Sequence, residues 1–235
     1  MSELHTGDLV GALAGAGSAD ELRTLVASAA RELGFDYCAY GMRAPLPMSN
    51  PRVHMFSNYP TAWQQRYAQE NYLASDPTVA QALRSVLPTV WDESLFSPNP
   101  GFWEEARAYG LNVGWAQSSC DAQGWVGMLT LARSHEALSA PELRHKSAHM
   151  SWLAHAAHAA MARMLASQLP QAPALTTREA EMLRWTADGK TSGEIAQFTG
   201  IAERTVNFHL NNAVDKLGVA NKTAAAVKAA MLRLL

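Results

Sequence analysis

Hydrophobic and polar positions follow two different patterns along the 235-residue chain. As far as residue 167, helical periodicity and strand-like alternation succeed one another. Helices are predicted over 18–33, 61–71 and 139–167, with another starting at Asp76; strands are predicted over 35–44 and 52–59, and a hairpin turns at the sequence CDAQG. Helices on both sides of an antiparallel sheet indicate an α+β fold, an α-β-α sandwich.

The second pattern begins after a break in the long helical stretch. Pro170 and Pro173 interrupt the periodicity and precede a new helix start. The sequence therefore predicts a first domain over 1–166, a linker over 167–174 and a small all-α domain over 175–235.

Composition narrows the class of protein. Hydrophobic residues make up 48% and charged residues 17%, which suits a globular protein with a sizeable core. The chain has no apolar run of about 18 residues, and acidic Glu3 and Asp8 stand where a signal peptide needs positive charge. Two cysteines are too few for a disulfide framework or a metal cluster of familiar spacing. We therefore expect a cytoplasmic protein with no membrane partner and no metal.

Four short helices are predicted in the last sixty residues, over 177–187, 192–198, 203–217 and 222–234. Their starts and stops are marked by capping boxes, by glycines and by a capping asparagine: Thr176 with Glu179, Thr191 with Glu194, Gly189, Gly200, Gly218 and Asn221. The tight turn TGIA between the second and third helices has helix-turn-helix spacing. Net charge is −4 before residue 175 and +2 after it, a weak sign that the second domain meets a polyanion.

The third of these helices has an apolar side and an unusual polar side. Val206, Leu210, Ala213, Val214 and Leu217 share the apolar side, and Arg204, Asn207, Phe208 and Asn211 share the other. Asparagine can pair with adenine, and an exposed aromatic ring can contact a thymine methyl, so this side suits a DNA major groove. Further residues are candidate phosphate contacts: Lys190, Thr191, Arg204, Thr205, Lys216 and Lys222. The alternative is a small helical protein-interaction domain.

The motifs LTxRExE.L.W.A.GKT..EIA and RTVNFH..N...KLG..NK resemble the LuxR-type (GerE-like) DNA-binding domain over nearly its whole length. One residue departs from the family pattern. Members often cap the recognition helix with Ser or Thr, and here the position is Ala202. Losing a cap typically costs about 1 kcal/mol, so Glu203 or a tertiary contact is expected to substitute.

A DNA-binding module needs an input, and the stretch NYPTAWQQRYAQENYLASDPTV suits one end of a small-molecule pocket. Tyr59, Trp63 and Tyr67 are spaced by four, and together with Asp76 they provide hydrogen-bond donors and acceptors. The apolar and hydroxyl candidates for the remainder of the pocket are Val79, Trp91, Phe96, Phe102, Trp103, Leu111, Met128 and Thr130, with Ala39, Gly41 and Val53 beside a chain tunnel. Structural alternatives exist, since Asp76-Pro77 is a good helix start and the aromatics suit a core.

The pattern NYPTAW...Y......DPTV...........W, followed by FWEEARAYGLNVG and GWVGMLTLAR, resembles the autoinducer-binding domain of LuxR-type quorum-sensing receptors. The resemblance implies that the effector is an N-acyl-homoserine lactone, with no other cofactor. It implies that Trp63 donates to the lactone carbonyl, Asp76 accepts the amide N–H and Tyr59 meets the acyl carbonyl. It also implies that further residues surround the ring and chain, namely Tyr67, Trp91, Phe102 and Ala106.

The same resemblance predicts the partners: double-stranded DNA with an inverted repeat, a second copy of the chain, and RNA polymerase as a candidate. We expect the helix over 139–167 to form much of the homodimer interface, with Ser139 and Glu142 as its capping box. It carries apolar residues at helical spacings: Leu143, Met150, Leu153, Ala157, Met161 and Met164. The histidines of this helix are interpreted as surface or interface residues, with a metal site or pH sensor as the alternative: His145, His149, His155 and His158. Three other hypotheses stay open: a receptor of the same fold for a different molecule, an enzyme acting on acyl lactones, and a ligand-independent DNA-binding regulator.

Overall fold

The computed structural model describes residues 6–167 and 174–235. They form two compact units, an N-terminal unit built from 6–44, 51–121 and 125–167, and a C-terminal unit that contains 174–235. Most of the predicted linker, 168–173, lies outside the described residues. The predicted domain boundaries at 166 and 175 stay a prediction.

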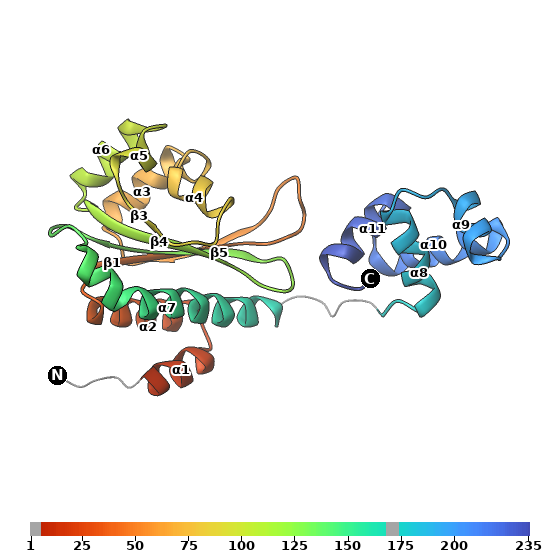
Figure 1. Cartoon of the computed structure of the whole chain (residues 1–235), viewed down its shortest axis with the longest axis horizontal. Helices are drawn as coiled ribbons and strands as arrows, with labels where there is room; N and C mark the ends of the chain where they lie inside the picture. The colour runs from red at the N-terminus through yellow and green to blue at the C-terminus, as the bar shows by residue number, and fades with distance from the viewer. Residues whose placement is uncertain (1–5, 168–173) are drawn as a thin grey trace. The chain divides into compact units, whose positions relative to one another are not determined.

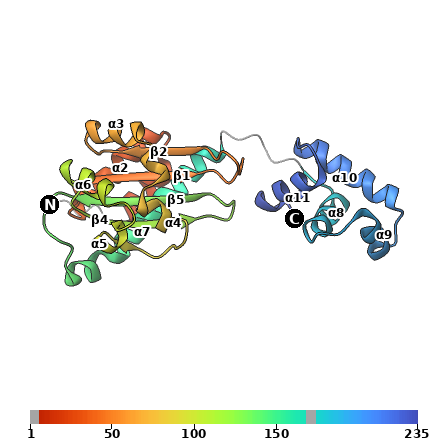
Figure 2. The same ribbon diagram turned by 90° about the horizontal axis from the view of Figure 1, so that it is seen from above.

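The N-terminal unit is built on a five-stranded antiparallel sheet with the strand order β2-β1-β5-β4-β3 (Figures 1 and 2). The strands are β1 (Tyr37–Arg43), β2 (Val53–Ser57), β3 (Thr89–Val90), β4 (Val113–Cys120) and β5 (Val126–Arg133). The two predicted strands and the predicted hairpin are confirmed as β1, β2 and β4–β5. The two-residue β3 was not predicted, because it is too short to show alternation.

Helices cover both faces of this sheet (Figure 1). On one face lie α1 (Thr6–Gly15), α2 (Ala19–Glu32) and α7 (Ala140–Ala166). On the other face lie α3 (Thr61–Gln69), the 3₁₀ turn η1 (Tyr72–Ala74), α4 (Pro77–Ala82), α5 (Glu93–Phe96) and α6 (Pro100–Ala108). The α-β-α sandwich is confirmed. Helices α1, α5 and α6 were not predicted, since they are short and have few periodic positions.

Helix α7 corrects the predicted dimer interface. Met150, Leu153, Ala157 and Met161 are at most 3% exposed and belong to the core that this helix forms with α2 and the sheet. Side chains that are already buried within one protomer cannot form a contact between two. For these four residues the interface prediction was therefore wrong, because the apolar side of a helix marks what is buried and does not say against which partner. An interface on another side of α7 stays a prediction.

Two further expectations about α7 were wrong. His158 is only 4% exposed, and its Nδ1 lies 2.9 Å from the hydroxyl of Tyr40, so it is not a surface residue. Ser139 caps the helix as predicted, accepting from the N–H of Glu142. The side chain of Glu142 accepts from the two terminal guanidinium nitrogens of Arg133, Nη1 and Nη2, and from the ammonium of Lys146 instead of completing a capping box.

The C-terminal unit contains α8 (Thr177–Ala187), α9 (Ser192–Thr199), α10 (Glu203–Leu217) and α11 (Lys222–Met231), close to the four predicted helices. Both of its capping boxes are present, and Gly200 and Gly218 end their helices in the left-handed region. The helices pack around a small core of Met182, Leu183, Ile195, Val206, Leu210, Ala213, Leu217, Ala225, Ala226 and Ala229. The four short helices together enclose one core, as the predicted starts and ends of these helices indicate.

Candidate ligand-binding cavity and nucleic-acid interface

A cavity of about 690 Å³ is lined by residues of the sheet of the N-terminal unit and of the helices α3 to α6. This volume falls within the range of small-molecule sites, about 300–1,000 Å³. All twelve ligand-binding candidates of the sequence line it: Tyr59, Trp63, Tyr67, Asp76, Val79, Trp91, Phe96, Phe102, Ala106, Leu111, Met128 and Thr130. Trp103, a further candidate, is not among the lining residues, because its ring stacks on the outer side of Phe96 with centroids 4.1 Å apart.

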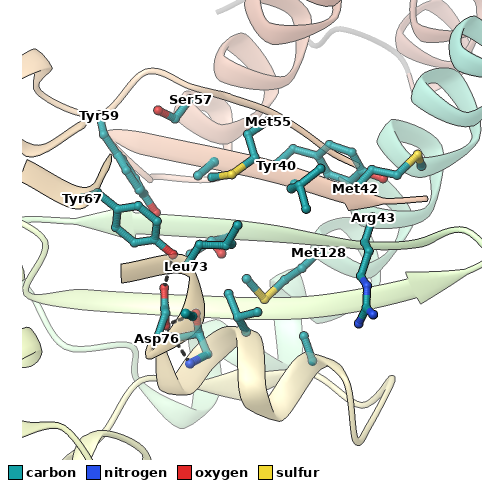
Figure 3. Close-up of a pocket in the computed structure, with 18 of the residues that line it drawn as sticks. Tyr40, Met42, Arg43, Met55, Ser57, Tyr59, Tyr67, Leu73, Asp76 and Met128 are labelled. Atoms are coloured by element: carbon teal, nitrogen blue, oxygen red, sulfur yellow. Dashed lines mark hydrogen bonds between the residues drawn. The ribbon is translucent and has the colours of Figure 1, made fainter. Parts of the chain in front are cut away.

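The polar end of the cavity is organised around Asp76 (Figure 3). One carboxylate oxygen, Oδ1, accepts from the backbone N–H of Thr78 at 2.8 Å and from its hydroxyl at 2.7 Å. The other, Oδ2, accepts from the hydroxyl of Tyr67 at 3.0 Å. The backbone N–H of Val79 also contributes a hydrogen bond to this carboxylate. Because a carboxylate oxygen can accept more than one hydrogen bond, Oδ2 is also a candidate acceptor for a ligand. The predicted helix start at Asp76-Pro77 is confirmed, and capping leaves this second function open.

Burial shapes the ionisation of this polar end. Asp76 is 8% exposed, and its burial raises the pKa of the carboxyl, against the hydrogen bonds from Thr78 and Tyr67, which favour the ionised form. Burial likewise raises the pKa of both Tyr59 and Tyr67, and the charge of Asp76 adds to the effect. Both phenols therefore stay protonated: Tyr67 donates its proton to Asp76, and Tyr59 can donate to an acceptor on a bound molecule.

Aromatic rings form the wall beside this polar end. Trp63 is 2% exposed and contacts Tyr67, Tyr72, Phe102 and Tyr109, with ring centroids between 5.5 and 5.9 Å. The indole of Trp91 covers Gly114 of β4 so closely that a Cβ there would lie 2.2 Å from the ring. Gly114 is thus required for the placement of Trp91 in the cavity wall.

The floor of the cavity consists of three rows of residues that face away from α7. Tyr40 of β1 bonds His158 of α7, so its neighbours Ala39, Gly41 and Arg43 face the opposite way, into the cavity. Strand pairing extends each row onto β2 and β5. The first row is Ser57-Ala39-Thr130, the second Met55-Gly41-Met128 and the third Val53-Arg43-Val126.

Several lining residues were missed by sequence reasoning: Arg43, Met55, Ser57, Leu73, Thr78 and Val126. The alternation along the predicted strands 35–44 and 52–59 could have supplied Arg43, Met55 and Ser57, which continue the periods of Ala39 and Val53. Leu73, which points into the cavity near Tyr67 in Figure 3, comes from the 3₁₀ turn and had no periodic signal.

The predicted DNA-contacting side of α10 is exposed in the C-terminal unit. Arg204, Asn207, Phe208 and Asn211 face solvent, and Phe208 is 59% exposed, whereas Val206 and Leu210 are at most 1% exposed. An exposed phenylalanine between two exposed asparagines is unusual for a solvated helix side. The predicted cap Ala202 makes no side-chain hydrogen bond, and the N-cap substitute expected from Glu203 is not formed.

Two of the predicted phosphate contacts have partners within the unit. The ammonium of Lys216 lies 2.7 Å from Oε2 of Glu179, whose side chain is 4% exposed. The ammonium of Lys222 donates to the hydroxyl of Ser192, which itself donates to Oδ1 of Asn207. The hydrogen bond from Ser192 fixes the orientation of the Asn207 amide, with its NH₂ group directed away from Ser192. Thr191 caps α9, and Lys190 lies over the ring of Phe198.

Comparison with known proteins agrees with both sites. Residues 18–161 match the family described as "Autoinducer binding domain", and residues 173–229 match "Bacterial regulatory proteins, luxR family". The chain belongs to the LuxR family of transcription regulators. It is an autoinducer-binding regulator with a helix-turn-helix output domain.

Individual relatives of this LuxR-family chain match it over almost its whole length. The transcriptional activator protein AnoR of Acinetobacter nosocomialis is 50% identical over 232 residues, 97% of this chain and 98% of the relative. The quorum-sensing regulator RhlR of Pseudomonas aeruginosa is 39% identical, over 87% of this chain and 86% of its own. These relatives are transcription regulators and not enzymes, which excludes the lactone-hydrolysing hypothesis.

A solved structure supports the fold. Escherichia coli SdiA superimposes with a TM-score of 0.77 at 33% identity, covering 96% of this chain and 95% of SdiA. A second structure of SdiA, with octanoyl-rac-glycerol, gives a TM-score of 0.76 at 33% identity and covers 95% and 92% of the two chains. Within residues 6–167 and 174–235, no helix is long and apolar enough to cross a membrane, and no group of three or more potential metal ligands occurs.

Proposed function

We propose that this regulator is a cytoplasmic receptor for an N-acyl-homoserine lactone and that the liganded protein binds as a homodimer to an inverted-repeat DNA site. The observation that supports the ligand class most directly is the buried carboxylate of Asp76, whose Oδ2 accepts from Tyr67 and can accept from a ligand as well. It lies at one end of a cavity lined mostly by apolar side chains, with Arg43 at the other end. An acyl lactone needs this arrangement, because it presents an amide N–H and two carbonyl groups at one end of an apolar chain.

Each polar residue at this end of the cavity contacts one polar group of the lactone. Asp76 accepts the amide N–H, and the phenol of Tyr59 donates to the acyl carbonyl. The indole N–H of Trp63, a group that can only donate, meets the lactone carbonyl. The remaining lining residues, among them Tyr67, Trp91 and Phe102, surround the ring. A ligand that adds hydrogen bonds to these buried polar groups and fills the cavity binds only the folded unit, so binding stabilises that unit by linkage.

The output side follows from α10. Asn207, Phe208 and Asn211 read base edges in the major groove. Arg204, Thr205, Lys190, Thr191, Lys222 and, where its ion pair allows, Lys216 contact phosphates. Two such helices in a symmetric dimer read two half-sites of an inverted repeat, and the DNA-bound dimer contacts RNA polymerase.

A thermal-shift series on the purified full-length chain tests the ligand class. Acyl-homoserine lactones of graded length are compared with wild type, Trp63→Phe and Asp76→Ala. Trp103→Phe is the matched control, because Trp103 does not line the cavity. A rise in melting temperature that depends on chain length, is lost in the two cavity variants and is kept in the control supports the proposal. No shift with any lactone, in protein that still binds DNA, overturns it.

A monoacylglycerol is the second candidate class, because the related SdiA has been solved with octanoyl-rac-glycerol. A glycerol ester has no amide N–H, so Asp76 would accept a hydroxyl instead. Octanoyl-homoserine lactone and octanoyl glycerol carry the same chain, and comparing their melting shifts on wild type separates the two head groups. A larger shift with the glycerol ester would assign the chain to receptors for a different molecule.

A further inference from the structure

Three glycines lie within the sheet of the N-terminal unit, and two of them are explained by the protein itself. A Cβ at Gly127 would lie 2.2 Å from the hydroxyl of Tyr40, and one at Gly114 would lie 2.2 Å from the ring of Trp91. In both places a side chain already fills the space. A glycine is therefore required for packing at these two positions.

Gly41 is different. A Cβ there would meet only the Cγ of Met55, at 3.5 Å, which is an ordinary van der Waals contact. Gly41 pairs regularly with Met55 on β2 and Met128 on β5, so no bulge accounts for it. A glycine inside a strand weakens it, and where no bulge or bend explains it, it commonly marks the close approach of a ligand. Its open side faces the cavity.

The position of Gly41 along the cavity indicates what the unfilled space beside it can accommodate. Tyr59, at the polar end, follows Ser57 of the first floor row by two residues in the chain, and both line the cavity. Figure 3 shows Tyr59 and Tyr67 at one end, Arg43 at the other, and Met55 and Met128 between them. In the middle row the two methionines flank Gly41, so the missing side chain leaves a passage between the polar end and the third row.

We propose that Gly41 is a specificity-determining residue, which admits an acyl chain of about ten or more carbons to the distal part of the cavity under Arg43. The proposal rests on the proposed function. Strands rise about 3.3 Å per residue, so the second row lies about 6.6 Å and the third about 13 Å from the first. An extended alkyl chain with bonds of about 1.5 Å advances about 1.25 Å per carbon. Chains of four carbons end before Gly41, and chains of about ten reach the third row.

The experiment compares full-length wild type, Gly41→Leu and Gly41→Ala. The matched control is Gly101→Leu, since Gly101 is exposed on α6 and a Cβ there meets nothing within 4 Å. Each protein is produced in a lactone-free host supplied with homoserine lactones carrying 4 to 14 carbons. Soluble yield, melting temperature and lactone affinity are measured. Soluble yield reports on binding even where the unliganded protein does not fold.

In wild type we expect affinity to rise about fourfold per carbon until about ten carbons, the value for a buried methylene. In Gly41→Leu we expect the rise to stop near six carbons, with at least a hundredfold loss for twelve and affinity for four within about threefold of wild type. Gly41→Ala, whose Cβ fits without a clash, should lose about tenfold for twelve carbons only.

Two outcomes would overturn the inference, and a third would overturn the proposed function. If wild type binds lactones and both Gly41 variants keep the chain-length profile of Gly101→Leu, Gly41 does not determine specificity, and the inference is overturned. The inference also fails if affinity in the variants falls equally for four and twelve carbons, because the passage is then not what changed. If no lactone of any length stabilises wild type, the proposed function itself fails.

Discussion

The hydroxyl of Tyr67 in α3 donates a hydrogen bond of 3.0 Å to Oδ2 of Asp76, the residue that caps α4 through its other oxygen. One carboxylate thus joins two helices of the cavity wall. It also remains an acceptor toward the cavity. Capping and ligand binding are therefore coupled through a single group, and substitutions can separate them.

Asp76→Asn and Asp76→Ala should behave differently. Asparagine caps helices about as well as aspartate, so Asp76→Asn should keep the helix start, whereas Asp76→Ala should lose about 1 kcal/mol of unfolding free energy. Both variants should lose lactone affinity, because neither offers the carboxylate to the amide N–H. Urea denaturation measures the first effect and the lactone thermal shift the second. Full lactone binding by Asp76→Asn would show that the ionised acceptor is not used.

Acid should weaken the N-terminal unit through Glu142. Its carboxylate is bonded by Arg133 and Lys146, and these bonds lower the pKa of Glu142 to about 2 from an ordinary 4.5. Because the folded pKa is the lower one, this stabilisation is complete above pH of about 4.5 and is lost as pH falls toward 2. We expect a loss on the order of 2 kcal/mol.

The matched variant for this acid effect is Glu142→Gln. Neutral glutamine cannot form the ion pairs with Arg133 and Lys146, so the unfolding free energy of Glu142→Gln should be lower than that of wild type at pH 7. Glutamine also does not titrate. The difference between the two proteins should shrink between pH 4.5 and 2. A difference that stays constant over this interval would mean that Glu142 is not held in its ionised form by Arg133. Urea denaturation at a series of pH values provides the measurement.

Two basic residues of the C-terminal unit should separate stability from DNA affinity. Lys216→Ala leaves the buried carboxylate of Glu179 without its ion-pair partner, so the unfolding free energy should fall by about 1–3 kcal/mol. Arg204 is exposed on the predicted DNA side, and Arg204→Ala should leave stability within about 0.5 kcal/mol. The slope of log affinity for DNA against log salt should decrease by about one in Arg204→Ala. Anisotropy titrations at several salt concentrations measure it.

Ala202→Ser should stabilise the protein. Ala202 already has the extended backbone of an N-cap, φ −66° and ψ 143°, but no side chain that can accept a hydrogen bond. A serine there should accept from a free N–H of the first turn of α10 and add about 1 kcal/mol. A melting curve of the C-terminal transition checks this. An unchanged melting temperature would mean that water or the neighbouring turn already satisfies those N–H groups.

The helix boundaries and the polar end of the cavity could be predicted because their signals lie in short stretches of the sequence. Capping boxes at Thr176 and Thr191 and the glycines at 200 and 218 fix where helices begin and end within a few residues. Tyr59, Trp63, Tyr67 and Asp76 lie close together in the chain, so one short segment brings them to one end of the cavity. The family motifs are likewise patterns along the sequence, so they could be recognised without the structure.

The tertiary structure decided what periodicity cannot express. An apolar stripe on α7 shows that Met150 and Leu153 are buried, but only packing shows that the sheet of the same protomer buries them. The side chain of Glu142 does not complete the predicted capping box, because Arg133, nine residues earlier, offers two charged donors. Gly41 became informative only when its space was compared with that of Gly114 and Gly127. Burial, ion pairing and empty space depend on which distant segments meet, and that is settled by the packing of the whole unit.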